Sequence, residues 1–171
     1  MPATEPTTTR ADEQPVFNTR LVEPLLKFFA ATHGQDAAVQ AVEAAGLTMA
    51  QLADPDLWIS ASSVNRLNRL LVERSGNPML TYEAGLAMIS PEYAGSTYYV
   101  LRSMGSPRLV YSQLPNLIKS LSRITNWQIE SLSRSHAVVR FEVAEGHSDD
   151  ELFCLNRKGA LVGIPKGLGL P

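Results

Sequence analysis

The strongest constraint on this chain is a change in the spacing of its apolar residues. From residue 16 to about residue 123 they recur every three or four positions, which is the period of amphipathic helices. From Trp127 to Val143 apolar and polar residues alternate, which is the period of strands with one covered face. The helical period then returns. Because a chain with both patterns must pack helices against a sheet, we expect an α+β fold with a helical layer on a small antiparallel sheet.

The helical part divides into segments with recognisable ends. The clearest expected helix covers residues 60–76, where Ser60 is a typical N-cap, Val64, Leu67 and Leu71 form an apolar stripe, and Gly76 ends the helix. The other expected helices cover residues 18–34, 36–45, 48–54, 78–88, 94–104 and 106–121.

The alternating part predicts a β-hairpin formed by residues 127–130 and 137–143, with a polar turn between them. Residues 148–151, Ser-Asp-Asp-Glu, match a capping box that opens a last helix. A two-stranded hairpin is marginally stable alone, and its open edges favour pairing with another strand. We therefore expect a homodimer that uses the hairpin or the helices beside it.

Composition limits the classes of function. The chain has 171 residues, 44% hydrophobic residues and a net charge of -2, so we expect one domain with a real core and no direct nucleic-acid binding. Residues 1–15 offer little to bury and are expected to be a disordered leader before a single domain at residues 16–171. No apolar run approaches a membrane span or a signal-peptide core, so we expect a cytoplasmic protein without a membrane partner.

The sequence contains none of the common catalytic or phosphate-binding motifs, which predicts that the protein is not an enzyme. His33, His136 and His147 are far apart and lack metal-ligand spacing, and Cys154 is the single cysteine. We therefore expect no metal and no cofactor. His136 and His147 are interpreted as solvated surface residues, and so are the dispersed basic residues Arg102, Arg108, Arg123, Arg134, Arg140, Arg157 and Lys158.

Aromatic residues and methionines gather in the middle third of the chain. They either fill a core or line an apolar cavity in which hydroxyl groups orient a ligand. Tyr98 and Tyr99 are adjacent on one expected helix, so they cannot both face inward. If the cavity exists, its candidate ligand-binding residues are Trp58, Met88, Tyr98, Met104, Tyr111 and Cys154.

Three groups of short motifs follow one another along the chain. The first includes the Asp-Pro at residues 54–55 with Trp58, and the Ser-Gly-Asn-Pro at residues 75–78. The second surrounds Ser106-Pro107, and the third joins the alternating strands to the Ile-Pro-Lys-Gly-Leu-Gly-Leu-Pro at residues 164–171. Together they resemble the N-terminal sensory domains of bacterial signalling proteins, which are similar to the 4-vinyl reductase type and, more distantly, to heme-nitric-oxide-binding domains.

The resemblance covers residues 20–171 and implies a non-catalytic input domain that encloses a pocket and is often dimeric. Its ligand would be small and apolar or amphipathic, and its output would pass to a downstream signalling domain or protein. The axial histidine and the Tyr-x-Ser-x-Arg element of the heme-binding relatives are absent, so heme is not implied. Two alternatives stay open. One is a protein-interaction module with a fully packed core, and the other is the effector domain of an arabinose-regulator-type transcription factor.

Overall fold

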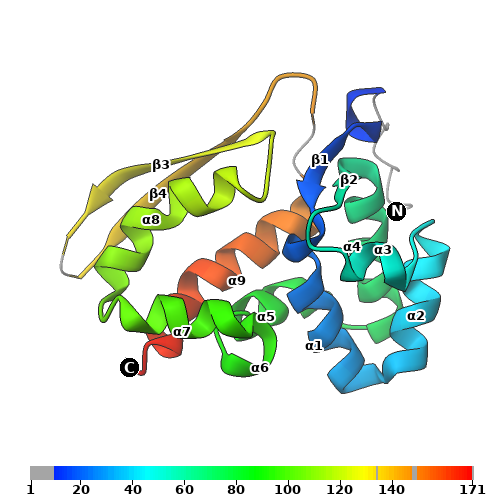
Figure 1. The fold of residues 1–171 in the computed structure, drawn as a ribbon, viewed down its shortest axis with the longest axis horizontal. Coiled ribbons are helices and arrows are strands. Elements are labelled where there is room, and N and C mark those ends of the chain that lie inside the picture. The colour runs from blue at the N-terminus through cyan, green and yellow to red at the C-terminus, as the bar shows by residue number, and fades with distance from the viewer. Residues whose placement is uncertain (1–9, 134, 148–149, 171) are drawn as a thin grey trace.

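The computed structural model describes residues 10–133, 135–147 and 150–170. Helices from the first half of the chain gather on one side, and a β-hairpin covers a helix on the other, with α9 running diagonally between them (Figure 1). The expected α+β class is confirmed. The described elements are η1 (Arg10–Glu13), β1 (Pro15–Asn18), η2 (Thr19–Leu21), α1 (Glu23–His33), α2 (Gln35–Ala44), α3 (Met49–Ala53), β2 (Trp58–Ser60), α4 (Ala61–Ser75), α5 (Leu80–Ala87), α6 (Pro91–Ala94), α7 (Ser96–Ser103), α8 (Pro107–Lys119), β3 (Thr125–Leu132), β4 (Ala137–Val143) and α9 (Glu151–Gly167).

Helix α4 forms where the sequence predicted it and lies at the centre of the larger core. The Ser60 hydroxyl oxygen accepts a hydrogen bond from the Ser63 amide at 3.2 Å, and Gly76 ends the helix in the left-handed conformation, with φ at 66°. Leu67 and Leu71 are fully buried against α1, α2 and α5. We call this cluster the N-terminal core; its largest members are Phe17, Leu25, Leu26, Phe29, Leu47, Leu52, Ile59, Leu67, Leu71, Leu80 and Phe153.

Two short strands within the expected helical region were not predicted. Strands β1 and β2 pair antiparallel, with Asn18 opposite Trp58. The amide of Asn18 also donates to the carbonyl oxygen of Leu121, and the amide of Arg123 donates to that of Val16, each at 2.9 Å. Strands of four and three residues are too short to show a period of two, and their partners lie about 40 and 100 positions away, so local periodicity misses them.

The predicted hairpin is confirmed and is longer than expected at its first strand. In β3–β4, Thr125 pairs with Val143 and Leu132 with Ala137. Helix α8 packs against β3 under the hairpin (Figure 1). This packing creates a second cluster, the hairpin core, formed by Leu101, Val110, Leu114, Trp127 and Ile164.

Helices α5 and α9 touch through their backbones. A Cβ added at Gly159 would overlap with the carbonyl oxygen of Tyr82, and one added at Gly163 would lie 2.7 Å from the carbonyl oxygen of Leu86. A Cβ at Gly85 would in turn lie 2.8 Å from the Ala160 amide nitrogen. Glycine is required at these positions because no side chain fits between the two helices. We call this contact the glycine seam; it comprises Gly85, Gly159 and Gly163, and Gly167 continues it against Ile89, just beyond the end of α5.

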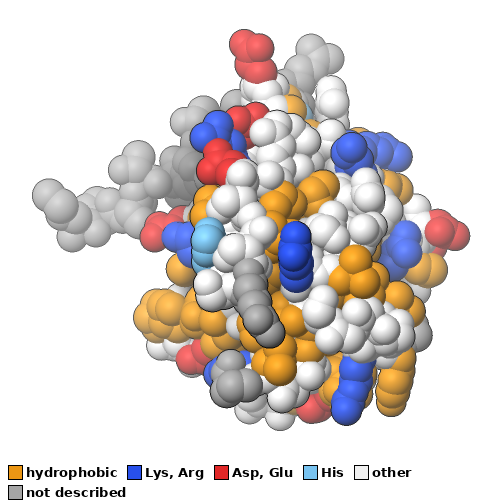
Figure 2. Space-filling view, turned by 90° about the vertical axis from the view of Figure 1, so that its left-hand side faces the viewer, with side chains coloured by type: hydrophobic (Ala, Val, Ile, Leu, Met, Phe, Trp, Pro, Cys, Tyr) orange, Lys and Arg blue, Asp and Glu red, His pale blue; other side chains and the backbone are white. Residues whose placement is uncertain are grey.

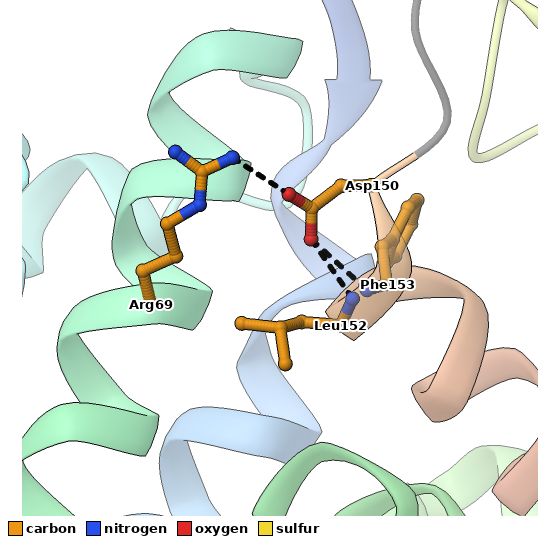
Figure 3. A network of polar contacts seen from close by, with 4 residues as sticks. All are labelled: Arg69, Asp150, Leu152 and Phe153. Carbon is orange, nitrogen blue, oxygen red and sulfur yellow. Dashed lines mark hydrogen bonds and ion pairs between the residues drawn. The ribbon is translucent and has the colours of Figure 1, made fainter. Parts of the chain in front are cut away.

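The start of α9 is fixed by Asp150, whose carboxylate accepts hydrogen bonds from the amides of Leu152 and Phe153 at 3.0 and 3.3 Å (Figure 3). The other carboxylate oxygen receives a hydrogen bond and ion pair from Arg69 of α4 at 3.0 Å (Figure 3). The predicted capping box placed the N-cap at Ser148, which is wrong because Asp150 caps the helix. Ser148 itself lies outside the described residues.

The predicted disordered leader, residues 1–15, is too long. Residues 10–13 form η1 and Pro15 begins β1, while residues 1–9 lie outside the described residues. Asp12 is buried and its carboxylate lies 3.4 Å from the ring nitrogen Nδ1 of His147. This contact also corrects the interpretation of His147 as a solvated residue, since its side chain is 8% exposed. No helix among the described residues is long and apolar enough to cross a bilayer.

Candidate ligand-binding site

No pocket described for residues 10–133, 135–147 and 150–170 brings the six candidate residues together. Trp58 lies in β2, where the Arg123 guanidinium stacks 4.1 Å from the centre of its ring. Met88 ends α5, and Cys154 lies half-buried in the first turns of α9. None of these three residues belongs to the hairpin core or lines one of the pockets described below.

The other three candidates belong to the hairpin side of the molecule. Tyr98 is buried in α7 and its hydroxyl oxygen accepts a hydrogen bond from Arg102 at 2.7 Å, whereas Tyr99 is 66% exposed, as their adjacency predicted. Met104 ends α7 and packs against the hairpin core. Of the six, Tyr111 alone lines a pocket described below.

Tyr111 lies where α8, α9 and the hairpin meet. Its hydroxyl donates a hydrogen bond to the carbonyl oxygen of Leu161 at 2.7 Å, which ties α8 to α9. Burial raises the pKa of the Tyr111 phenol. The ring therefore stays neutral and fixed in orientation at physiological pH.

A pocket of about 750 Å³ opens beside Tyr111, within the size range of small-molecule sites. It lies between the first turn of α8, the turn of the hairpin and the C-terminal end of α9. Its apolar wall is formed by Pro107, Tyr111, Leu132, Ala137, Pro165 and Leu170. Its polar groups are those of Ser106, Arg108, Ser133, Ser135 and His136.

The charge of this lining is positive in sign. Arg108 carries this charge, His136 borders the pocket beside it, and none of the described lining residues is acidic. Among the described residues, no carboxylate lies within ion-pair distance of Arg108. The first turn of the 13-residue helix α8 also faces this space, and its dipole adds positive potential. Figure 2 shows this end of the molecule, where hydrophobic and basic side chains lie near the middle and both basic and acidic side chains lie toward the margin.

His136 holds the hairpin turn in shape. Its Nδ1 lies 2.6 Å from the Ser133 hydroxyl oxygen, and the same hydroxyl accepts hydrogen bonds from the amides of Ser135 and His136. The side chain is exposed, as the sequence predicted. Ser133, Ser135 and His136 therefore form one wall of the pocket.

A smaller groove of about 380 Å³ lies on the other side of Tyr111 and Ala137. It is apolar, and it is also lined by Val138, Val139, Leu161 and Val162. Val138 and Val162 are 44% and 53% exposed. Tyr111 and Ala137 thus separate two cavities.

Sequence reasoning missed the polar half of the pocket. Arg108 and His136 were both assigned to solvated surface. Two features of the sequence could have indicated this polar half. One is the basic helix start Ser106-Pro107-Arg108, and the other is the polar turn of the predicted hairpin. A further basic residue was misjudged: Arg157 is 7% exposed, and its guanidinium lies 4.3 Å from the Phe153 ring and 4.8 Å from the Phe141 ring.

Within the described parts of the chain, no group of three or more His, Cys, Asp or Glu side chains is placed to hold a metal ion. A scan against known protein families finds no family that matches the chain, and a search of curated proteins finds no relative. The chemistry of the pocket therefore carries the functional argument.

Proposed function

We propose that the protein is a non-catalytic regulatory input domain that binds a small amphipathic ligand in the pocket beside Tyr111. The observation that carries this proposal is the lining of the 750 Å³ pocket, which joins an apolar wall to Arg108 and His136 without any acidic residue. An apolar wall favours a hydrocarbon body, and a basic, hydrogen-bonding rim favours a carboxylate or similar acceptor at its end.

The three groups of motifs, taken in their order along the chain, resemble bacterial sensory domains, and this resemblance supports the same class of function. In that setting the domain works in the cytoplasm as a homodimer, and it passes the ligand signal to a downstream signalling or transcription-control partner. The fixed Tyr111 ring contributes by giving the ligand a rigid wall, because its hydroxyl is already bonded to Leu161.

A thermal-shift experiment tests this proposal. Octanoate and decanoate serve as probes, and octanol and decanol serve as uncharged counterparts of the same length. We expect the carboxylates to raise the melting midpoint more than the alcohols, since a ligand at 100 times its Kd adds about 2.7 kcal/mol to stability.

The variant Arg108→Gln identifies the site. It is expected to remove the preference for the carboxylate over the alcohol while leaving the midpoint of the ligand-free protein within about 2 °C, as for a surface substitution. Arg66→Gln is the matched control, because Arg66 is an exposed arginine on α4 outside the pocket. The proposal fails if no probe shifts the midpoint, or if both variants respond to the probes as the wild type does.

A further inference from the structure

Strand β4 has one edge without a neighbouring strand among the described residues, since it pairs with β3 alone. The amide of Ala144 donates to the carbonyl oxygen of Ile124 at 2.8 Å, and the carbonyl oxygen of His136 accepts from the amide of Ser133 at 2.9 Å. Backbone groups alternate between the two sides of an antiparallel strand. The even-numbered residues of β4 therefore turn their backbone groups toward β3, and Val139, Phe141 and Val143 turn theirs toward the open edge.

We propose that this edge pairs with the same edge of a second copy of the chain, antiparallel and with Phe141 opposite the partner's Phe141. The interface is a continuous four-stranded sheet across a two-fold axis, in the order β3, β4, the partner's β4 and the partner's β3. This proposal deepens the homodimeric part of the proposed function and rests on it, but it does not depend on the ligand.

The charges on the outer face of β4 select this register. Arg140 and Glu142 both point outward, and their side chains are 56% and 58% exposed. With Phe141 on the axis, each Arg140 lies opposite the partner's Glu142, so the interface gains two ion pairs. These are non-hydrogen-bonded positions, where opposite side chains approach most closely.

The neighbouring registers lack this complementarity. An axis at Arg140 places the two Arg140 side chains opposite each other, and like charges in that position are unfavourable. An axis at Val139 places Arg140 opposite the partner's Val138, which leaves Arg140 without an acidic partner across the interface. The alternation of Arg140 and Glu142 is thus self-complementary in one register.

Arg140 is already held in the outer row. Its guanidinium contacts Glu130 of β3 at 2.5 Å and lies 4.0 Å from Glu142 of its own strand. A side chain that is ordered before association loses less conformational entropy when it meets the partner's Glu142.

The apolar groove beside Tyr111 lies at this same edge. Residues from both faces of β4 line it together with Leu161 and Val162 of α9, and β3 contributes none, which places the groove beyond the open side of β4. In the proposed register the partner's Val143 comes opposite Val139 and the partner's Ala144 comes opposite Val138. The second copy therefore covers the exposed valines that border the groove, which removes apolar surface from water.

Charge reversal in the full chain tests the register. The mass of the wild type is measured by sedimentation from low to high micromolar concentration, and we expect a species of twice the 18.7 kDa chain mass. Arg140→Glu and Glu142→Arg each place two like-charged pairs across the interface, so each is expected to raise the dimer Kd about tenfold or more. Arg66→Glu, on the exposed side of α4, is the matched control and is expected to dimerise as the wild type does.

An equimolar mixture of the two variants gives the decisive result. Positions 140 and 142 are both acidic in Arg140→Glu and both basic in Glu142→Arg, so a dimer of one variant with the other again has two pairs of opposite charge across the interface. The mixture is therefore expected to recover the wild-type dimer mass. Circular dichroism checks that each variant is folded. Glu142→Arg stays informative if Arg140→Glu does not fold, because among the described residues Glu142 loses a single ion pair, at 4.0 Å.

The proposal is overturned by a wild type that stays monomeric throughout, by single variants that dimerise normally, or by a mixture of folded variants that does not associate. The first outcome means that another occupant, or none, pairs with the edge. The thermal shift with decanoate, measured on the same variants, separates failure of the dimer from failure of ligand binding.

Discussion

Gly159→Ala is the substitution for which two physical effects compete most directly. Alanine is the better helix former, and the exchange of Gly for Ala inside a helix gains about 1 kcal/mol. At Gly159, however, the new Cβ would overlap with the carbonyl oxygen of Tyr82 and lie 3.0 Å from the amide nitrogen of Leu86. Both of these atoms belong to the backbone of α5, so neither can rotate away.

Overpacking of a well-packed site costs about 1–3 kcal/mol, and rigid backbone atoms place this site near the upper value. Subtracting the helix propensity leaves a net loss of about 2 kcal/mol. For a domain of this size that loss lowers the melting midpoint by about 4–8 °C. Thermal and urea unfolding followed by circular dichroism measure it.

Gly163→Ala provides a graded comparison, because its Cβ would lie 2.7 Å from the carbonyl oxygen of Leu86 and overlaps less. We expect its loss to be smaller than that of Gly159→Ala. Lys158→Ala is the control on the exposed face of α9, and its effect is expected to stay within about 0.5 kcal/mol. A higher midpoint for Gly159→Ala than for the wild type would refute the close contact between α5 and α9.

Two further predictions concern polar contacts. Asp150→Ala removes both the helix cap and the partner of Arg69, and is expected to lower the free energy of unfolding by about 2 kcal/mol, of which the cap accounts for about 1. Asp150→Asn keeps a capping oxygen and is expected to lose about half as much in urea unfolding; equal losses would contradict the assignment of the cap. Because burial raises the pKa of Tyr111 in the folded state, the unfolded state releases this proton first, so stability is unchanged below about pH 10 and falls as the pH rises further. Tyr111→Phe removes the hydrogen bond to Leu161 and is expected to lower the free energy of unfolding by about 1 kcal/mol at pH 7. Its free energy of unfolding is also expected to fall less steeply than that of the wild type at alkaline pH. An equally steep fall would argue against the burial of this phenol.

The sequence predicts best those elements whose signals are local. Helix α4 has its cap, its stripe and its terminal glycine within 17 consecutive residues, and the structure confirms all three. The hairpin β3–β4 was also predictable, since its alternation is long and its turn is polar. In contrast, β1 and β2 depend on hydrogen bonds to distant segments, which no local period reveals.

The candidate site was predicted less well for a related reason. Apolar and aromatic side chains mark both cores and pockets, so Trp58, Tyr98 and Cys154 could not be sorted by type alone. Tyr111 was identified by type, but Arg108 and His136 join it only because the hairpin turn folds back onto the start of α8. Likewise, Gly159 and Gly163 carry no apolar signal, and their role follows from a contact with α5 that is made 75 or more positions away.

The position of α9 has a consequence for how the molecule unfolds. Phe153, near the beginning of this helix, belongs to the N-terminal core, and Ile164, near its end, belongs to the hairpin core. Between them, the glycine seam fixes the helix against α5. Neither core opens fully while the helix stays in place, and loss of the helix removes a buried side chain from both. We therefore expect the two cores to unfold as one cooperative unit, in which a defect on the hairpin side lowers the stability of the helices around α4 as well.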